Sequence, residues 1–294
     1  MEKEFHIWDF PEDKVRVLLK NHNSFLEECI NKFGSIRILS DFLGTSYQNV
    51  YAWRFHNLYI PLWALKKIVD KLELDWFSIE ESVIAYKGVN LSNPIINPKL
   101  PIIESSELFA IIAHLIADGC VTNNGIPIYV NKNRDLANNF IDLVINTFGE
   151  VPYRKIEPKK GVFEYRFSKI LADLIHFFYN IHFKSKIALL PEGLFNSSNE
   201  SFCSVIGAIV DDEGSVRKNR IVIGMKNKDL ILQIRYLIVR VLGKNSIAQL
   251  CYRENGTYYF SIRSGYMAKF NNKVKLYHSD KQKKMEIIYR NSYK

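Results

Sequence analysis

One short pattern occurs twice in this chain and constrains its fold more than any other feature. Residues 111–119 read IIAHLIADG, and residues 206–214 read IGAIVDDEG. Each copy is an apolar run with small residues that closes with an acid and a glycine. Asp118 and Glu213 hold matching positions, 95 residues apart, so the spacing predicts two related repeats.

Helix geometry indicates how the two copies could meet. If each copy is helical, Ala113 and Ala117 share one stripe, and Ala208 and Asp212 share another, with Gly207 beside it. Small residues on a common stripe allow two helices to approach closely. We therefore expect the two helices to pack about a pseudo-two-fold axis.

The ends of the two expected helices carry the chemistry. Gly119 and Gly214 stand where helices commonly stop in a left-handed turn. Asp118 and Glu213 would then lie at C-terminal helix ends, where the helix dipole disfavours an acid. Two such acids would repel unless a cation lies between them, and hard divalent metals bind carboxylate oxygens. The pattern predicts a metal–carboxylate centre that can activate water against a phosphodiester. The plainer alternative is two ordinary buried helices with acidic ends.

Both stretches resemble the LAGLIDADG motif of homing endonucleases, in its single-chain form with two repeats. The first copy departs from the motif at His114 and Ile116, whereas the second keeps an acid pair in AIVDDEG. The resemblance implies an α+β fold of two pseudo-symmetric αββαββα repeats that form a saddle for duplex DNA. It also implies that Asp118 and Glu213 are the catalytic acids and bind Mg²⁺ or another divalent cation. We interpret His114 as a packed or interface histidine rather than a ligand.

The resemblance further implies a lysine near the metal centre in each repeat. Lys186, or nearby Lys184, lies upstream of the second motif, and Lys281 lies in the matching zone of the second repeat. Lys186 follows Asp118 by 68 residues, and Lys281 follows Glu213 by the same number. The equal offset favours Lys186 and Lys281 as catalytic lysines, although lysine-rich segments are commonly only solvated.

The positive charge of the chain is concentrated after its first hundred residues. The whole chain has 40 Lys/Arg and 31 Asp/Glu, a net charge of +9. Residues 1–100 contain 12 basic and 13 acidic residues, so the remainder contains 28 basic and 18 acidic residues, a net charge of +10. A cationic repeat region suits the phosphates of nucleic acid.

Composition also indicates the cellular setting. The four cysteines, Cys29, Cys120, Cys203 and Cys251, form no CxxC pair, so neither a zinc site nor a disulfide framework is indicated. No apolar run approaches the length of a membrane span, and no signal peptide opens the chain. We expect an intracellular, cytoplasmic monomer that acts away from membranes.

Residues 1–87 are predicted to form a small all-α domain. Helices are expected at 25–33, 36–43, 47–55 and 60–72, and Gly44 lies in the turn between the second and third. The stretch FGSIRILSDFLGTSYQNVYAWRF resembles helix-turn-helix domains of phage-repressor type. That resemblance places the third helix in the major groove, with Val50 and Trp53 toward the core. The candidate DNA contacts are Ser46, Gln48, Asn49 and Arg54. A helical protein-interaction bundle is the alternative, because the local charge is near zero.

The remaining segments are predicted from composition and alternation. Residues 88–101 contain three prolines and several Asn and Ser, which indicates a linker that would let both modules engage DNA together. The first repeat is placed at 102–198 and the second at 199–294. In each repeat, alternating strands predict a buried face and a polar, basic face. The candidate DNA contacts on the polar faces are Lys132, Arg154, Lys155, Arg166, Arg217, Lys218, Arg220, Arg253, Tyr259 and Arg263.

The combined prediction is a site-specific DNA endonuclease that makes metal-dependent double-strand breaks at a long recognition site. Two alternatives stay open. A DNA-binding transcriptional regulator could keep the fold without cleavage, since some bacterial regulators combine it with a helix-turn-helix; intact acids in both copies speak against this role. An RNA-binding intron maturase, whose partner would be structured intron RNA, is a role that members of the resembled family can also have.

Overall fold

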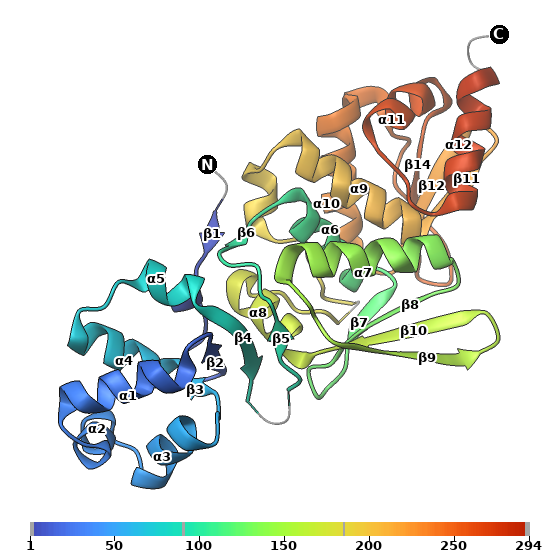
Figure 1. Ribbon diagram of the computed structural model, residues 1–294. Coiled ribbons are helices and arrows are strands. Elements are labelled where there is room, and N and C mark those ends of the chain that lie inside the picture. The colour runs from blue at the N-terminus through green and yellow to red at the C-terminus, as the bar shows by residue number, and fades with distance from the viewer. Residues whose placement is uncertain (1–2, 90–91, 185, 292–294) are drawn as a thin grey trace.

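Two buried helices, one from each copy of the repeated pattern, lie at the centre of the structure (Figure 1). α6 (Ser106–Ile116) and α9 (Asn199–Glu213) pack against each other, and most of their residues are buried. Each helix begins at a serine cap: the Ser105 hydroxyl accepts a hydrogen bond from the Leu108 N–H at 3.3 Å, and Ser198 caps α9 in the same way. This computed structural model describes residues 3–89, 92–184 and 186–291.

Each central helix opens a repeat of the same order of elements. The first repeat continues with β7 (Gly119–Val121), β8 (Pro127–Asn131), α7 (Arg134–Phe148), β9 (Tyr153–Lys159), β10 (Val162–Phe167) and α8 (Lys169–Tyr179). The second continues with β11 (Gly214–Arg217), β12 (Arg220–Met225), α10 (Lys228–Leu242), β13 (Cys251–Tyr252), β14 (Tyr258–Ile262) and α11 (Met267–Lys273). The antiparallel sheets have the matching orders β7-β8-β10-β9 and β11-β12-β14-β13. The predicted α+β fold of two αββαββα repeats is confirmed.

The strands alternate between the core and the exposed face, as their sequences predict. In β10, Phe163, Tyr165 and Phe167 are buried, whereas Arg166 between them is exposed. In β14, Phe260 and Ile262 are buried. Figure 1 shows the β9–β10 hairpin projecting away from the helices, so its exposed face is open to a large ligand.

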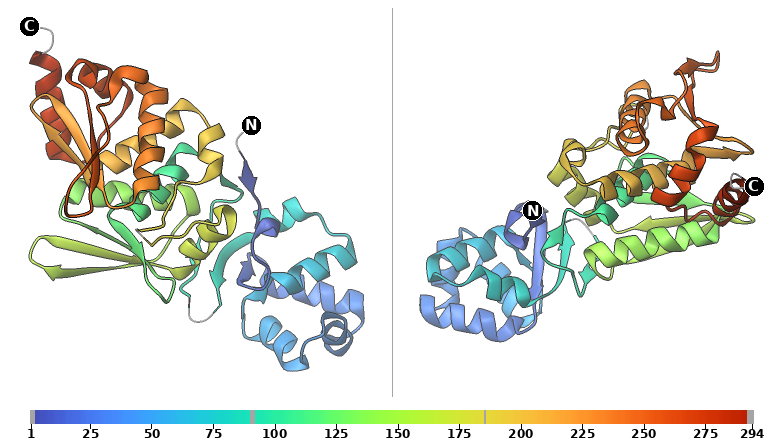
Figure 2. Two further views of the ribbon diagram at one scale, coloured as in Figure 1. Left: turned by 180° about the vertical axis from the view of Figure 1, so that it is seen from behind. Right: turned by 90° about the horizontal axis from the view of Figure 1, so that it is seen from above.

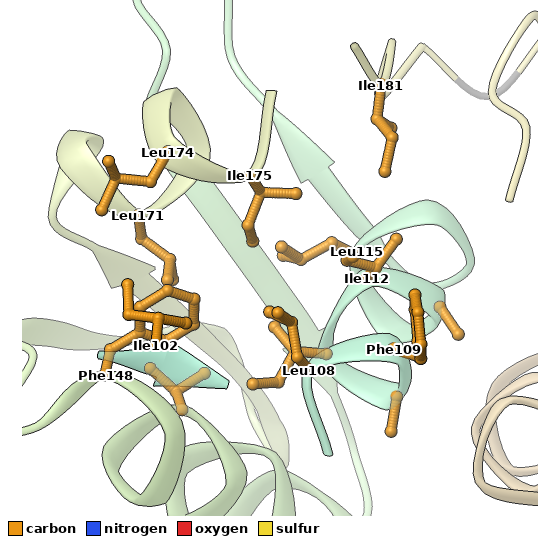
Figure 3. Packing of buried hydrophobic residues seen from close by; sticks show 14 of the residues in the cluster. Ile102, Leu108, Phe109, Ile112, Leu115, Phe148, Leu171, Leu174, Ile175 and Ile181 are labelled. Atoms are coloured by element: carbon orange, nitrogen blue, oxygen red, sulfur yellow. The ribbon is translucent and has the colours of Figure 1, made fainter. Parts of the chain in front are cut away.

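The core of the first repeat forms around α6. Figure 3 shows side chains of this helix lying among those of α8, with residues of β6 and the end of α7 beside them. The residues in contact include Leu108, Ile112, Leu115, Leu171, Ile175, Ile102 and Phe148, all with 0% exposure. Each fully buried aliphatic side chain contributes about 1.5–3 kcal/mol, so this apolar packing holds the helix in place against the dipole and the acids at its end.

The N-terminal unit contains a sheet, so the prediction of an all-α domain is wrong. Its helices are α1 (His22–Phe33), α2 (Ile36–Leu43), α3 (Tyr47–Phe55), α4 (Leu62–Leu72) and α5 (Trp76–Glu81). They accompany a sheet of order β3-β2-β4-β5, formed by β3 (Ile60–Pro61), β2 (Val15–Leu19), β4 (Val83–Gly88) and β5 (Ile95–Ile96). β2 and β4 pair across the whole helical stretch. Local propensity does not reveal a pairing between segments so far apart in sequence.

The helix-turn-helix portion of that unit agrees with its prediction. α2 and α3 have the predicted bounds, and Gly44 between them adopts a left-handed conformation with φ 72°. Ser46 caps α3. Val50 and Trp53 are buried, as predicted. α1 begins three residues earlier than expected and α4 two residues later.

The segment predicted to be a linker, residues 88–101, is part of the packed structure. Ile96 and Glu150 exchange backbone hydrogen bonds of 3.1 and 2.9 Å, which tie β5 to the first repeat. Just after it, β6 (Ile102–Ile103) pairs with β1 (Glu4–Phe5). Residues 90–91 of this segment lie outside the described residues. The N-terminal unit lies beside the repeats, not over their sheets (Figure 2).

A C-terminal helix that the sequence analysis did not predict follows α11. α12 (Ser279–Asn291) lies beside β11 (Figure 1). Its sequence is rich in lysine and weakly amphipathic, which explains why it was taken for a solvated segment. Among the described helices, none combines the length and apolar character that a membrane crossing requires.

Candidate active site

Glycine is required after both central helices because the chain turns back against the helix. Gly214 has φ −80° and ψ 143°, and neither Gly119 nor Gly214 has a positive φ. A Cβ on Gly119 would lie 2.6 Å from the Leu115 Cα, and one on Gly214 would lie 2.5 Å from the Val210 carbonyl oxygen. The predicted left-handed turn is therefore wrong. In each repeat a strand begins at the glycine and folds over the last helical turn.

This tight exit brings acids from both repeats into one group. Asp118 follows α6, and the last three residues of α9 are Asp211, Asp212 and Glu213. We call these four residues the acid cluster. A hollow opens beside Asp118, lined by Asp118, Val130, Asn131, Lys132, Val162, Asp211, Asp212, His278 and Lys281.

The acids affect one another electrostatically. Asp118 is exposed in the hollow, yet desolvation by the surrounding protein, followed by the charges of Asp212 and Glu213, raises its pKa to about 7. The pKa of Glu213 is also raised, by burial and then by the charge of Asp212. Lys281 opposes both shifts. The arrangement therefore concentrates negative charge that a cation would relieve.

Asp212 is held by two side chains of the first repeat. His114 Nδ1 lies 2.8 Å from one carboxylate oxygen, and the Tyr129 hydroxyl donates to the other at 2.8 Å. Burial lowers the pKa of His114, but the charge of Asp212 and the hydrogen bond to it outweigh that effect and raise it. His114 is thus an interface residue that links α6 to the end of α9, as predicted. The sequence analysis did not select Tyr129, because only the pairing register of β8 places its hydroxyl next to the Asp212 carboxylate.

Asp211 anchors the segment that leads into α12. Its carboxylate accepts hydrogen bonds from the backbone N–H groups of Tyr277 and His278, at 2.8 and 3.1 Å. This contact places Lys281 against the end of α9, where its ammonium donates to the carbonyl oxygens of Val210 and Asp211. Burial lowers the pKa of Lys281, and all four members of the acid cluster oppose that effect. Lys281 therefore lies among the acids and also caps the helix end.

Lys186 has a different position from Lys281. It is exposed in the loop that follows α8, and it is not among the described residues that line the hollow. Lys281 lies in α12 and Lys186 in a loop, so the equal sequence offset does not give the two lysines the same local structure.

The structure separates the predicted DNA contacts of the first sheet. Arg154 and Arg166 are directly opposite each other in β9 and β10, so they share the exposed face. Lys155 is opposite the buried Tyr165, on the other face of the hairpin from Arg154; its side chain is exposed, and its ammonium lies 4.5 Å from the centre of the Phe163 ring. Lys132 lies in the hollow.

The second sheet gathers most of its candidates on one face. Arg217 and Arg220 are directly opposite each other, with Lys218 in the turn between them. The Arg253 guanidinium lies 4.6 Å from the centre of the Tyr259 ring. The exposed Arg263 donates from Nε to the Ile247 carbonyl at 3.1 Å. A basic, partly aromatic face results.

The candidate contacts on α3 have local partners. Ser46 caps the helix, Asn49 donates to the Thr45 hydroxyl at 2.8 Å, and Arg54 forms an ion pair with Glu27 at 2.8 Å. Gln48 is exposed. The exposed face of α3 also carries Tyr47, Tyr51 and Phe55, a pattern at spacing four that the sequence analysis overlooked; the first two rings stack, and the Phe55 ring is tilted against that of Tyr51.

The acid cluster fits a hard divalent cation by its donor chemistry. Within the described residues, no three His, Cys, Asp or Glu side chains are close enough to form a complete metal cage. Magnesium does not need one, because it commonly keeps several waters and binds through one or two carboxylates. Asp118 and Glu213 are the side chains that would hold it.

Comparison with known proteins gave one sequence relative and several structural ones, and no family model matches the chain. The glutamine–fructose-6-phosphate aminotransferase (isomerizing) of Methanocaldococcus jannaschii is 28% identical over 170 residues. The match covers 54% of this chain but only 15% of that protein, so this chain matches a small part of the relative's length.

Three solved structures have a similar fold. Full-length WhiA from Thermatoga maritima matches with a TM-score of 0.46 and 13% identity, over 64% of this chain and 61% of that one. Mesophilic variants of the homing endonuclease I-DmoI match with a TM-score of 0.42 and 19% identity, over 57% of this chain and 95% of theirs. The homing endonuclease I-WcaI, bound to its DNA recognition sequence, matches with a TM-score of 0.41 and 12% identity, over 58% and 81%. These likenesses concern the fold alone.

Proposed function

We propose that this protein is a metal-dependent, site-specific DNA endonuclease. The observation that carries the proposal is the convergence of Asp118 and Glu213, from matching positions of two repeats, in one acid cluster. Burial and neighbouring carboxylates raise the pKa of both acids, which is costly to stability, and such perturbed groups are concentrated at functional sites. The exposed basic faces of the two sheets supply the surface for a long duplex.

The reaction is hydrolysis of a phosphodiester. The oxygen of a water forms a bond to phosphorus, the bond from phosphorus to one sugar oxygen breaks, the water loses a proton, and the departing oxygen gains one. A divalent cation held by Asp118 and Glu213 would supply an activated water and stabilise charge on the phosphate.

The chain's own residues support that chemistry. Lys281 presents positive charge where the phosphate becomes more negative, and electrostatic stabilisation of this kind is commonly a large part of catalysis. His114 and Tyr129 hold Asp212, and thereby fix the end of α9 next to Glu213.

A DNA-binding regulator that does not cleave is the second candidate. The observation that favours it is that Lys281 already donates to two backbone carbonyls, which leaves one of its three N–H groups for a phosphate.

Cleavage of a randomised duplex DNA library in the presence of Mg²⁺ decides between the two candidates. We expect the wild type to cut at a defined site and both Asp118→Asn and Glu213→Gln to lose cutting while they still bind DNA. Asp142→Asn, which alters an exposed acid on α7, is the matched control and should cut normally. Salt-sensitive binding without cuts by the wild type would support the regulator and overturn the nuclease.

A further inference from the structure

A second cavity, of about 360 Å³, lies along the packed pair of α6 and α9. Its lining comes from these two helices, from α7, which packs along α6 (Figure 1), and from the segment after α11. Among the described residues, none that lines this cavity also lines the hollow at the acid cluster. We infer that the cavity binds a small molecule with an anionic group at one end and an amine at the other, such as an amino acid or an aminoalkyl phosphate. The inference does not depend on the proposed nuclease function.

The floor of the cavity is one stripe from each central helix. Glu107, Ala110 and His114 follow one another at spacings of three and four on α6, and Glu200 and Ala208 share a face of α9. The glutamates are in the first turn of each helix. With a rise of 1.5 Å per residue, Glu107 and His114 are about 10 Å apart along α6. The cavity therefore has two ends that differ in chemistry.

His114 provides a buried polar group at one end. The residue is 1% exposed, and its Nδ1 atom is engaged by Asp212 at 2.8 Å. No described residue forms a hydrogen bond with its other ring nitrogen, Nε2. Burial alone would lower the pKa of His114, but the charge of Asp212 and the hydrogen bond to it raise that pKa overall. A ring with both nitrogens protonated has an Nε2–H group that an anion in the cavity can accept.

The segment after α11 adds positive charge along one rim. The Lys275 carbonyl oxygen lies 2.7 Å from the position that a Cβ on Gly207 would take, so this segment runs directly against α9. Lys275 is therefore at the level of Gly207, well away from Glu200 at the start of the helix. Lys273 lies nearer that start, where its charge opposes the rise that burial causes in the pKa of the Cys203 thiol. Both lysines are exposed at the cavity, and the described part of the chain gives neither an ion-pair partner.

Glu107 and Glu200 make the other end negative. Both are exposed, and neither forms an ion pair with a Lys, Arg or His of the described ranges. Glu107 accepts a hydrogen bond only from the adjacent Ser106 hydroxyl, at 3.1 Å, within those ranges. Two carboxylates at one mouth of the cavity favour an ammonium group and repel a second anion.

The middle of the cavity is apolar. Ala110, Ala208 and Leu143 line it between the charged ends, which suits a short chain of methylene groups. The volume is within the range of about 300–1,000 Å³ that small-molecule sites have. Charged side chains at a rim are by themselves ordinary solvated groups. Here they lie at opposite ends of a cavity that also contains a buried imidazole with a free nitrogen, and this arrangement complements a molecule of opposite polarity.

A cysteine in the lining allows binding to be located. Cys203 is half-buried in the cavity, whereas Cys120 and Cys251 are exposed elsewhere and serve as internal controls. The probes are γ-aminobutyrate and phosphoethanolamine. At about ten times its Kd, a probe that binds here should slow iodoacetamide labelling of Cys203 by about 10-fold and leave the other two cysteines unchanged. Glutarate, which has the chain length of γ-aminobutyrate but a carboxylate at both ends, should give no protection at equal ionic strength.

The negative end is tested by substitution of exposed residues. Glu107→Gln combined with Glu200→Gln should weaken γ-aminobutyrate binding by about 10-fold in titration calorimetry and remove the preference over glutarate, because hydrogen bonds to charged groups are lost. Glu192→Gln changes an exposed glutamate outside the cavity lining and should bind as the wild type does.

The possible outcomes are distinct. Protection of Cys203 by one or both probes supports the site, and the probe that protects identifies a carboxylate or a phosphate as the anionic group. Protection by neither probe would mean that the cavity holds only water and would overturn the inference. Equal protection by glutarate, equal slowing at all three cysteines, or unchanged binding in the double variant would also overturn it. None of these results bears on DNA cleavage, so failure of this inference and failure of the proposed function are separate.

Discussion

At the scale of single residues, the acid cluster lowers the stability of the folded state at neutral pH. Desolvation, followed by the charges of Asp212 and Glu213, raises the pKa of Asp118 to about 7. An acid whose pKa is higher in the folded state than its unfolded value binds its proton more tightly when folded. The folded state therefore loses stability as the pH rises from about 4 toward about 7.

The first prediction follows from this loss of stability with rising pH. In metal-free buffer, Asp118→Asn should have a higher Tm than the wild type at pH 8, and the difference should shrink toward about pH 3, where the wild-type acid is mostly protonated in both states. Added Mg²⁺ should raise the Tm of the wild type at pH 8 more than that of the variant. Thermal unfolding at the two pH values tests this. A variant that is less stable than the wild type at pH 8 would contradict it.

The second prediction concerns the buried pair that joins the repeats. The side chains of His114 and Asp212 are 2% and 0% exposed. Removing one partner leaves the other charge buried, so His114→Ala should lower the free energy of unfolding by about 3–5 kcal/mol in urea titrations. His182→Ala, an exposed histidine, is the control and should change it by less than about 0.5 kcal/mol. A loss below about 1 kcal/mol in His114→Ala would show that the pair does not hold the interface.

At the scale of elements, little or no chain separates helix from strand at the site: β11 begins directly after α9, and two turn residues, Ala117 and Asp118, lie between α6 and β7. The strand that follows each central helix begins at a glycine that lies against the helix backbone. This abrupt exit keeps Asp118 and Glu213 next to the ends of the central helices.

The third prediction tests that exit. Gly214→Ala should lower the free energy of unfolding by about 1–3 kcal/mol, because its Cβ would lie 2.5 Å from the Val210 carbonyl oxygen. Gly265→Ala, where no atom lies within 4 Å of the added Cβ, should cost much less. Equal losses of stability in Gly214→Ala and Gly265→Ala would show that close approach to the helix is not the reason for a glycine at position 214.

The fourth prediction concerns the β9–β10 hairpin as a DNA-binding element. Arg154→Gln with Arg166→Gln should weaken duplex binding and reduce the slope of log affinity against log salt by about 1.8, or about 0.9 for each lost phosphate contact. Lys155→Gln removes the same charge from the adjacent position, which lies on the other face, and should change the slope little. Fluorescence anisotropy over a salt series tests both. If Lys155→Gln reduces the slope as much as either arginine change, the prediction that only the face with Arg154 and Arg166 contacts the duplex is contradicted.

At the scale of the whole molecule, the N-terminal unit is docked on the repeats. Phe5 and Phe178 stack with ring centres 4.0 Å apart, Phe10 lies 5.5 Å from the same ring, and β5 bridges to Glu150. The unit that carries α3 therefore has a set position relative to the sheets, with α3 at the end remote from them (Figure 1).

The fifth prediction tests this docking. Phe178→Ala should separate the unfolding of the N-terminal unit from that of the repeats, which calorimetry would detect as an added transition at lower temperature. Phe177→Ala is the matched control, because Phe177 is the adjacent residue and is itself 51% exposed. A single unchanged transition in Phe178→Ala would show that the aromatic contact does not couple the two parts.

The sequence by itself determined the elements whose signals are local. The bounds of α2 and α3 were predicted correctly, because a polar cap, an apolar period and a turn with a glycine lie within a few residues of each other. The duplicated pattern likewise indicated the two repeats and selected Asp118 and Glu213, since corresponding positions of a duplicated fold meet at its axis.

Only the tertiary structure decided which distant residues join those acids. The β2–β4 pairing, the placement of Lys281 by Asp211, and the separation of Lys155 from Arg154 depend on contacts between segments far apart in the chain. Equal spacing in sequence did not give Lys186 the setting of Lys281, because the described residues between α8 and α9 contain no α-helix that corresponds to α12. Local propensity acts over a few residues, whereas register and loop path are set by packing across the whole molecule.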